Sequence, residues 1–63
     1  MLTVFVRVKV KPNLEEDYVA AAKALVKSSR KELENITYDF CKISGVDSEY
    51  CFVERWESHS SLE

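Results

Sequence analysis

The chain has 63 residues, of which 46% are hydrophobic and 32% charged, and its formal net charge is −2. This length allows one small domain, residues 1–63, and the apolar content is too high for an intrinsically disordered chain. The acidic net charge argues against nucleic-acid binding. The sequence has no apolar run long enough to span a membrane and no secretory signal pattern, which predicts a cytoplasmic protein with no membrane contact.

A domain of this size needs additional stabilisation. It buries only about 60% of the surface that its unfolded chain exposes, so it usually relies on a disulfide, a metal or a partner subunit. Two cysteines, Cys41 and Cys51, and one histidine, His59, are too few for a four-ligand zinc site. We expect no metal and two buried thiols packed as small apolar groups. The expected stabilising partner is therefore a second copy of the chain, in a homodimer or higher homo-oligomer.

The first segment, residues 2–11, predicts a strand. Five apolar side chains point one way, and Thr3, Phe5 and three basic residues point the other, which gives the period of two that is typical of a strand with one buried face. Pro12 ends this segment because proline has no N–H to donate.

A helix is predicted over residues 14–33. Asn13 with Glu16 three positions later matches a capping box, and acidic residues at the start with basic residues near the end complement the helix dipole. The apolar residues recur at steps of three and four, which is the spacing of a helix lying on a sheet. They are Leu14, Tyr18, Ala21, Ala22, Leu25 and Val26.

Two further strands are predicted, over residues 36–43 and from residue 49 or 50 to 56, joined by a short loop into an antiparallel hairpin. Placing Cys41 opposite Cys51 gathers the aromatic residues on one face, whereas a slip of one residue scatters them. One helix covers one face only, so the other face is expected to meet a partner subunit.

The order strand, helix, strand, strand matches the first four elements of a ferredoxin-like βαββαβ unit, so the predicted fold is α+β, a truncated ferredoxin-like domain. Ser58 and Ser61 suit the first turn of a second helix that is cut short, with His59 exposed in that turn. Alternatively, Leu62 and Glu63 are the remnant of a cloning site.

The residues resemble the antibiotic biosynthesis monooxygenase family, also called the quinol monooxygenase-like group. The resemblance rests on the order and spacing of VFVRVKVKPNLEEDYVAAAKALVKSSRKE, NITYDF and FVERWESHSSLE, which together span most of the chain. It implies a protomer that pairs sheet against sheet into a dimeric α+β barrel. It also implies a cofactor-independent oxygenase acting on phenols, anthrones or quinols, in which the deprotonated substrate itself reduces dioxygen.

Two departures from the family pattern bear on activity. Leu33 and Glu34 stand where the family usually has Pro-Gly, and the chain ends before the second helix, which carries the family's histidines. The first strand lacks the Asn that a haem-degrading branch of the superfamily uses, which argues against that chemistry. We therefore expect this chain to be inactive or very weak as an oxygenase. The alternative is a non-catalytic barrel that binds a small ligand or a protein, because fold alone does not assign function.

Five residues are candidates for lining a pocket, and each has a structural alternative. Tyr38 could donate a hydrogen bond to an aromatic substrate, and Trp56 could stack on it. Alternatively, both pack in the core with Phe52, which is also a candidate for lining the pocket. Glu54 shares their face and could act as a base, although an ion pair with a basic residue of the first strand is favoured. Asn35 could orient a substrate, or serve the turn in which it lies. No catalytic constellation is complete.

Overall fold

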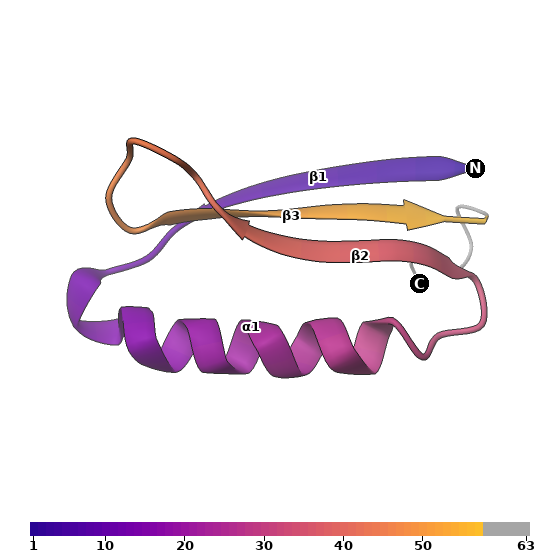
Figure 1. The fold of residues 1–63 in the computed structure, drawn as a ribbon, viewed down its shortest axis with the longest axis horizontal. Coiled ribbons are helices and arrows are strands. Elements are labelled where there is room, and N and C mark those ends of the chain that lie inside the picture. Colours follow the sequence, from indigo (N-terminus) through magenta and orange to yellow (C-terminus); the bar gives the residue numbers. More distant parts are fainter. Residues whose placement is uncertain (58–63) are drawn as a thin grey trace.

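The computed structural model describes residues 1–57, which form a three-stranded antiparallel sheet with one α-helix against one side of it (Figure 1). The elements are β1 (Leu2–Lys9), a short 3-10 helix η1 (Pro12–Leu14), α1 (Glu15–Ser29), β2 (Asn35–Lys42) and β3 (Glu49–Trp56). The strand order β1-β3-β2 places β3 at the centre, antiparallel to both neighbours. Since β1 and β2 then run parallel on either side of β3 and α1 connects them, this is the split βαβ of the ferredoxin-like fold.

This architecture confirms the predicted α+β, ferredoxin-like class. The expectations for Ser58, Ser61, His59, Leu62 and Glu63 lie outside the described residues. None of the helices within residues 1–57 is long and apolar enough to cross a membrane.

Strand β1 forms because Val recurs at every second position from Val4 to Val8, and β-branched side chains pack well on a pleated surface. It is two residues shorter than predicted. Val10 follows the end of the strand and is buried, and its N–H donates to the carbonyl of Ser48 in the β2–β3 loop at 2.8 Å. Gly45 and Ser48 have positive φ angles of 78° and 59°, which turn this loop sharply.

Helix α1 differs from the prediction at both ends. The 3-10 turn carries the chain into the helix, with Leu14 N–H donating to the Lys11 carbonyl at 2.9 Å, and no side chain caps the helix, so the predicted Asn13 capping box is wrong. At the other end, Lys31 and Glu32 bond to carbonyls three residues back, which tightens the chain into a turn after Ser29. Leu33, placed in the helix by prediction, is 99% exposed.

The predicted hairpin register is confirmed. Cys41 lies directly opposite Cys51, and Phe40 lies opposite Phe52. Cys51 is buried as expected, but the expectation of two buried thiols is wrong for Cys41, which is exposed because β2 is an edge strand of the described sheet. The ladder shifts by one residue between Asn35 and Thr37, so Ile36 is the extra residue of a β-bulge and is 43% exposed.

The sheet thus has two faces. The helix-facing side comprises Leu2, Val4, Val6, Val8, Tyr38, Phe40, Tyr50, Phe52, Glu54 and Trp56, and the outer face comprises Thr3, Phe5, Arg7, Thr37, Asp39, Cys41, Cys51, Val53 and Arg55. The core forms on the helix-facing side, where Ala22 and Val26 of α1 pack on Tyr38, Phe52 and Trp56. No element of residues 1–57 covers the outer face, and Phe5 there is 64% exposed.

Candidate functional site

Four of the five candidate residues lie together on the helix-facing side of the sheet. Phe52, Glu54 and Trp56 alternate along β3, and Tyr38 lies opposite Glu54 on β2. All four side chains are buried. The period of two that predicted a shared face therefore brings one carboxylate and three aromatic rings into one cluster.

The Glu54 carboxylate is the only acidic group among the buried polar residues of the described chain, and it is 9% exposed. The indole N–H of Trp56 donates to its Oε1 at 2.9 Å. The favoured prediction, an ion pair between Glu54 and a basic residue of β1, is wrong: Glu54 lies opposite Val4, whereas Arg7 of β1 pairs with Glu49 at 2.9 Å. A hydrogen bond to an indole offsets part of the cost of burying a carboxylate.

Tyr38 is a phenol held in its neutral form. Burial raises the pKa of its hydroxyl above 10.0, the nearby Glu54 carboxylate raises it further, and a hydrogen bond with the Ser29 hydroxyl acts in the opposite direction. Because the hydroxyl keeps its proton at neutral pH, Tyr38 can donate a hydrogen bond to a bound oxygen atom but cannot act there as a base.

The aromatic rings form a continuous row along the sheet. Tyr38 meets both Trp56 and Phe52 edge to face, with ring centroids 6.2 Å and 5.9 Å apart, and Phe40 lies 4.9 Å from Phe52 and stacks on Tyr50 at 5.1 Å. These separations are within the range in which aromatic pairs attract one another. We call this apolar row the aromatic platform; its neighbouring rings are tilted to one another by 44° to 90°, except for the stacked pair of Phe40 and Tyr50 at 14°.

Asn35 does not join this cluster through its side chain. Its Nδ2 group donates to the carbonyls of Thr37 at 3.0 Å and Arg55 at 3.4 Å. Those bonds hold the β-bulge at the start of β2, and the Asn35 backbone N–H donates to the Glu32 carbonyl at 3.1 Å in the turn for which a structural role was the alternative. It lies opposite Trp56 in the ladder, at the same end of the sheet as the cluster.

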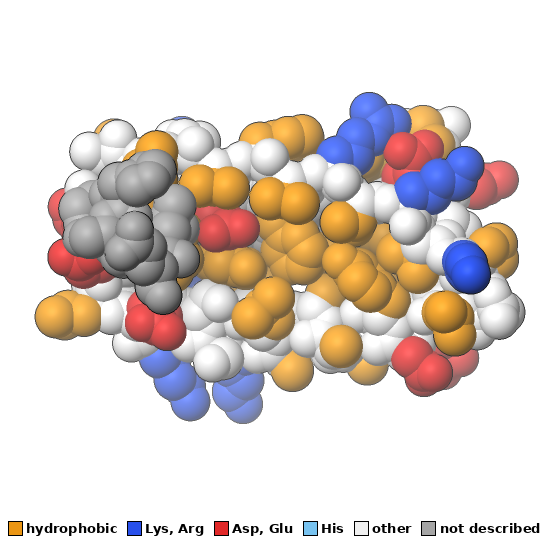
Figure 2. Space-filling view, turned by 180° about the vertical axis from the view of Figure 1, so that it is seen from behind, with side chains coloured by type: hydrophobic (Ala, Val, Ile, Leu, Met, Phe, Trp, Pro, Cys, Tyr) orange, Lys and Arg blue, Asp and Glu red, His pale blue; other side chains and the backbone are white. Residues whose placement is uncertain are grey.

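One side of the aromatic platform is incompletely covered. Helix α1 packs against β2 rather than β1, so the apolar side chains of β1 receive less cover and Val6 is 40% exposed. Figure 2 shows hydrophobic side chains gathered in the middle of this rear side, with charged groups toward the ends. Neither an open pocket nor a closed cavity is present within residues 1–57. We call this region, formed by Val4, Val6, Val8 and the neighbouring residues of β3, the open side.

Two polar contacts of the core were not predicted from the sequence. Ser29 is buried at the end of α1 beside Tyr38, whereas Ser28 next to it is exposed. The Tyr50 hydroxyl donates to the Glu15 carboxylate at 2.8 Å, which joins β3 to the start of α1. Helical spacing places Ser29 three residues after Val26 on the buried stripe, and that was the available signal.

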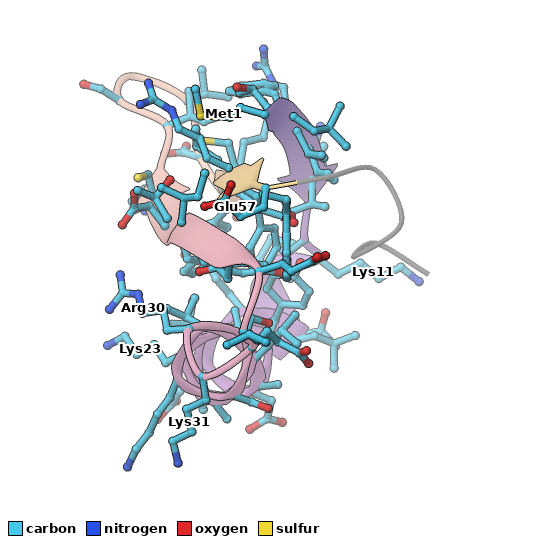
Figure 3. The ribbon with its side chains drawn as sticks, turned by 90° about the vertical axis from the view of Figure 1, so that its right-hand side faces the viewer. Met1, Lys11, Lys23, Arg30, Lys31 and Glu57 are labelled. Carbon is cyan, nitrogen blue, oxygen red and sulfur yellow. The ribbon has the colours of Figure 1, made fainter. Side chains whose placement is uncertain are left out.

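The basic side chains of α1 and of the turn after it lie away from the platform. Figure 3 shows Lys23 projecting outward from α1, and Arg30 and Lys31 projecting outward from the turn that follows the helix. Arg30 bridges to β2, where its Nε donates to the Tyr38 carbonyl at 2.9 Å and its guanidinium pairs with Asp39 at 3.1 Å. Within the described residues no three His, Cys, Asp or Glu side chains gather to hold a metal ion.

Comparisons with known proteins converge on one family. The family model for antibiotic biosynthesis monooxygenase matches residues 1–63. The chain is 29% identical over 63 residues to “Putative monooxygenase YcnE” of Bacillus subtilis (strain 168), covering all of this chain and 66% of that protein.

Solved structures share the fold. The crystal structure of an antibiotic biosynthesis monooxygenase superposes with a TM-score of 0.92 at 24% identity, over 98% of this chain and 65% of that one. PA3566 from Pseudomonas aeruginosa superposes with a TM-score of 0.88 at 23% identity, over 95% of this chain and 61% of that one. In each case the chain spans less than two thirds of the length of its relative.

Proposed function

Because the chain belongs to the antibiotic biosynthesis monooxygenase family, we propose that its aromatic platform is part of the site of a cofactor-independent monooxygenase. The substrate class is an electron-rich aromatic such as an anthrone or a quinol. An aromatic ring of this kind can pack on the apolar rings from Tyr50 to Trp56, edge to face or stacked, as those rings pack on one another.

The observation that carries the proposal is the buried Glu54 carboxylate between Trp56 and Tyr38. The Trp56 N–H occupies one of its two oxygens, at 2.9 Å, and fixes its orientation. The other oxygen can accept a proton from the substrate. Tyr38, which keeps its own proton, can donate to the oxygen on which negative charge then develops.

For an anthrone the chemistry balances without a cofactor. Glu54 removes a proton from the carbon opposite the carbonyl group, and the resulting anion transfers electrons to dioxygen. One oxygen atom enters the product as a new carbonyl group, the other leaves as water, and the anthrone becomes an anthraquinone. The protein contributes the base, the hydrogen-bond donor and an apolar surface that keeps the ring in position.

The outer face supports the expected assembly. Its exposed Phe5, together with Val53 and the two cysteines, would be removed from water by a second sheet, and apolar residues on a solvent-facing sheet favour such packing. We propose a homodimer that pairs outer face to outer face, with both aromatic platforms on the outside of the pair.

Turnover by the 63-residue chain should be slow. The open side leaves apolar surface of β1 in contact with water, with Val6 40% exposed, and the reactive anion needs a site from which water is excluded. We expect a saturable interaction with the ligand and an oxygen uptake only slightly above the spontaneous rate.

The test measures both quantities. An anthrone is titrated against the fluorescence of Trp56, the only tryptophan, and oxygen uptake is followed with no added metal or flavin. We expect saturable quenching, and a small uptake that Glu54→Gln abolishes and Tyr38→Phe weakens. Glu57→Gln, which changes an exposed carboxylate at the end of the same strand, should have no effect. Uptake that survives both site substitutions, or an absence of saturable binding, contradicts the proposed site.

A non-catalytic binding module is the second candidate. It is favoured by the pairing of the buried polar atoms, because no buried side-chain nitrogen or oxygen within the described residues lacks a partner. This candidate predicts the same quenching with an oxygen uptake equal to the spontaneous rate in the wild type and in Glu54→Gln alike.

A further inference from the structure

The end of α1 holds one residue of the candidate site from two directions. Ser29, the last residue of the helix, is buried at 9% exposure, whereas Ser28 beside it is exposed. The Ser29 side chain shares a hydrogen bond with the Tyr38 hydroxyl. Arg30, the next residue, donates from its Nε to the Tyr38 backbone carbonyl at 2.9 Å. Two consecutive residues therefore contact Tyr38 at its phenol and at its backbone.

This helix end is anchored on both sides of Ser29. The Arg30 N–H donates to the Val26 carbonyl at 3.0 Å, and the Glu32 N–H donates to the Ser29 carbonyl at 3.0 Å. The Arg30 guanidinium also pairs with Asp39 at 3.1 Å, which ties the helix end to β2. Helix ends often fray, but these bonds fix the place of Ser29 against β2.

The register of the hairpin brings the Glu54 carboxylate near the same phenol. The Ile43 N–H donates to the opposite Glu49 carbonyl at 3.0 Å, so these two residues form a hydrogen-bonded pair. Such pairs alternate with non-hydrogen-bonded pairs along an antiparallel ladder, which makes Tyr38 and Glu54 a non-hydrogen-bonded pair. The Cα atoms of such a pair are typically about 4.5 Å apart, and their side chains lie closer together than in the other kind.

That carboxylate decides which of the two hydroxyls donates. In a bond between two hydroxyls either oxygen can be the donor, since each has one proton. The negative charge of Glu54 favours a phenol proton that points toward it, and the Tyr38 oxygen then accepts from Ser29. The other titratable or charged neighbours of Tyr38 are a second phenol on α1 and the ion pair at its own backbone, formed by Tyr18, Arg30 and Asp39.

We propose that Ser29 is a positioning residue of this site, which donates to the Tyr38 oxygen and leaves the Tyr38 proton for the oxygen atom of a ligand. A hydroxyl that accepts a hydrogen bond is polarised and becomes a stronger donor. With Tyr38 as donor and Glu54 as acceptor, the site selects an aromatic ring that carries a ketone or its enolate over the same ring without oxygen. The choice of ligand rests on the proposed function, whereas the role of Ser29 toward Tyr38 can be measured without it.

The first measurement is a tyrosine titration of the 63-residue chain by near-ultraviolet absorbance. The bond from Ser29 lowers the pKa of Tyr38, so Ser29→Ala should move the Tyr38 step to higher pH. Tyr38→Phe identifies that step among the three tyrosines. Ser29→Thr, which keeps a hydroxyl, should restore the wild-type position, and Ser28→Ala, at the exposed neighbour, should leave it unchanged.

The second measurement compares two ligands that differ only in the carbonyl group. Anthrone and dihydroanthracene, in which a methylene group replaces the carbonyl, are titrated separately against the fluorescence of Trp56 in the absence of oxygen. Ser29→Ala should weaken anthrone binding about 2–10-fold, which corresponds to one hydrogen bond, and leave dihydroanthracene binding unchanged. A general loss of packing would instead weaken both ligands alike.

Three results would overturn the proposal: a Tyr38 step that stays at its wild-type pH in Ser29→Ala, anthrone binding that this variant does not change, or equal weakening of both ligands. Circular dichroism checks the fold of each variant. If Ser29→Ala unfolds, Ser29→Cys takes its place, because a thiol is a weaker donor and should shift the step in the same direction by less. If neither ligand binds the wild type, the proposed function is contradicted, and the titration by itself decides the role of Ser29.

Discussion

The two faces of the sheet are made from alternate residues of the same strands, yet they differ in almost every physical respect. On the helix-facing side, rings pack edge to face and the buried Glu54 carboxylate accepts a bond from Trp56. On the outer face, a phenylalanine is largely exposed and the charges pair at the surface. The difference teaches that the face of the sheet on which a residue lies, more than its chemical type, should determine how much stability is lost when the residue is substituted.

Phe5 and Phe52 provide the sharpest test, because they are the same residue type on opposite faces. Phe52→Ala should destabilise the fold by about 3–5 kcal/mol, since it opens a cavity among Tyr38, Phe40 and Trp56. A domain of this size has a total stability of the same order, so the variant should be largely unfolded. Phe5→Ala, at 64% exposure, should change the stability of the dilute monomer by less than about 1 kcal/mol.

Urea unfolding followed by circular dichroism measures both variants. Repeating it across protein concentrations separates folding from assembly, because an interface on the outer face makes the Phe5→Ala penalty grow with concentration. Equal penalties for the two variants at low concentration would show that the two faces do not differ as described.

The next largest effect should come from the Trp56–Glu54 bond. Trp56→Phe keeps most of the ring but removes the N–H donor, so the Glu54 carboxylate is left buried without that bond and the stability should fall by about 1–3 kcal/mol. Glu54→Leu combined with Trp56→Phe should cost less than the sum of the two single changes, because neither polar group then lacks its partner. Strict additivity in this double-mutant cycle would mean that the bond contributes nothing.

The aromatic side of this comparison could be predicted from the sequence. A slip of one residue would separate Tyr38 from Phe52 and Trp56, so the predicted register keeps the three on one face, and Glu54 lies there because it alternates with Phe52 and Trp56 along β3. Helix α1 and the order of the described elements likewise followed from the periodicity of the apolar residues.

The partners of these residues could not be predicted in the same way. An acceptor on an apolar face needs a donor, but a one-dimensional pattern does not say whether Arg7 or Trp56 supplies it. The β-bulge at Ile36 and the 3-10 turns that end α1 at Ser29 depend on where the chain must go next. Tertiary contacts decide these features, and local propensity does not specify them.

Tyrosine titration sharpens the comparison at the level of single hydroxyl groups. Both Tyr38 and Tyr50 have a pKa raised above 10.0, the first mainly by burial and the second mainly by its hydrogen bond to Glu15. The folded protein therefore retains protons that the unfolded chain releases, so the free energy of unfolding should fall as the pH rises above about 10.

Near-ultraviolet absorbance of tyrosinate measures this titration. Glu15→Gln should move the pKa of Tyr50 back toward its usual value, because the charged acceptor is gone. Glu16→Gln, an exposed neighbour in the same helical turn, is the matched control and should leave the titration unchanged. A free energy of unfolding that stays constant above pH 10 would contradict the assigned shifts.

The smallest effect is expected on the outer face, from the ion pair that joins β1 to β3. The Arg7 Nε lies 2.9 Å from Glu49 Oε1, but more than half of the Arg7 side chain is exposed, so solvent screens the attraction and ordering the long side chain costs entropy. A double-mutant cycle of Arg7→Gln and Glu49→Gln should give a coupling of about 0.2–1 kcal/mol that shrinks as salt is added. A larger coupling that salt does not weaken, measured in the monomer, would mean that this pair is shielded from water, and the outer face would then resemble the helix-facing side more than its exposed Phe5 indicates.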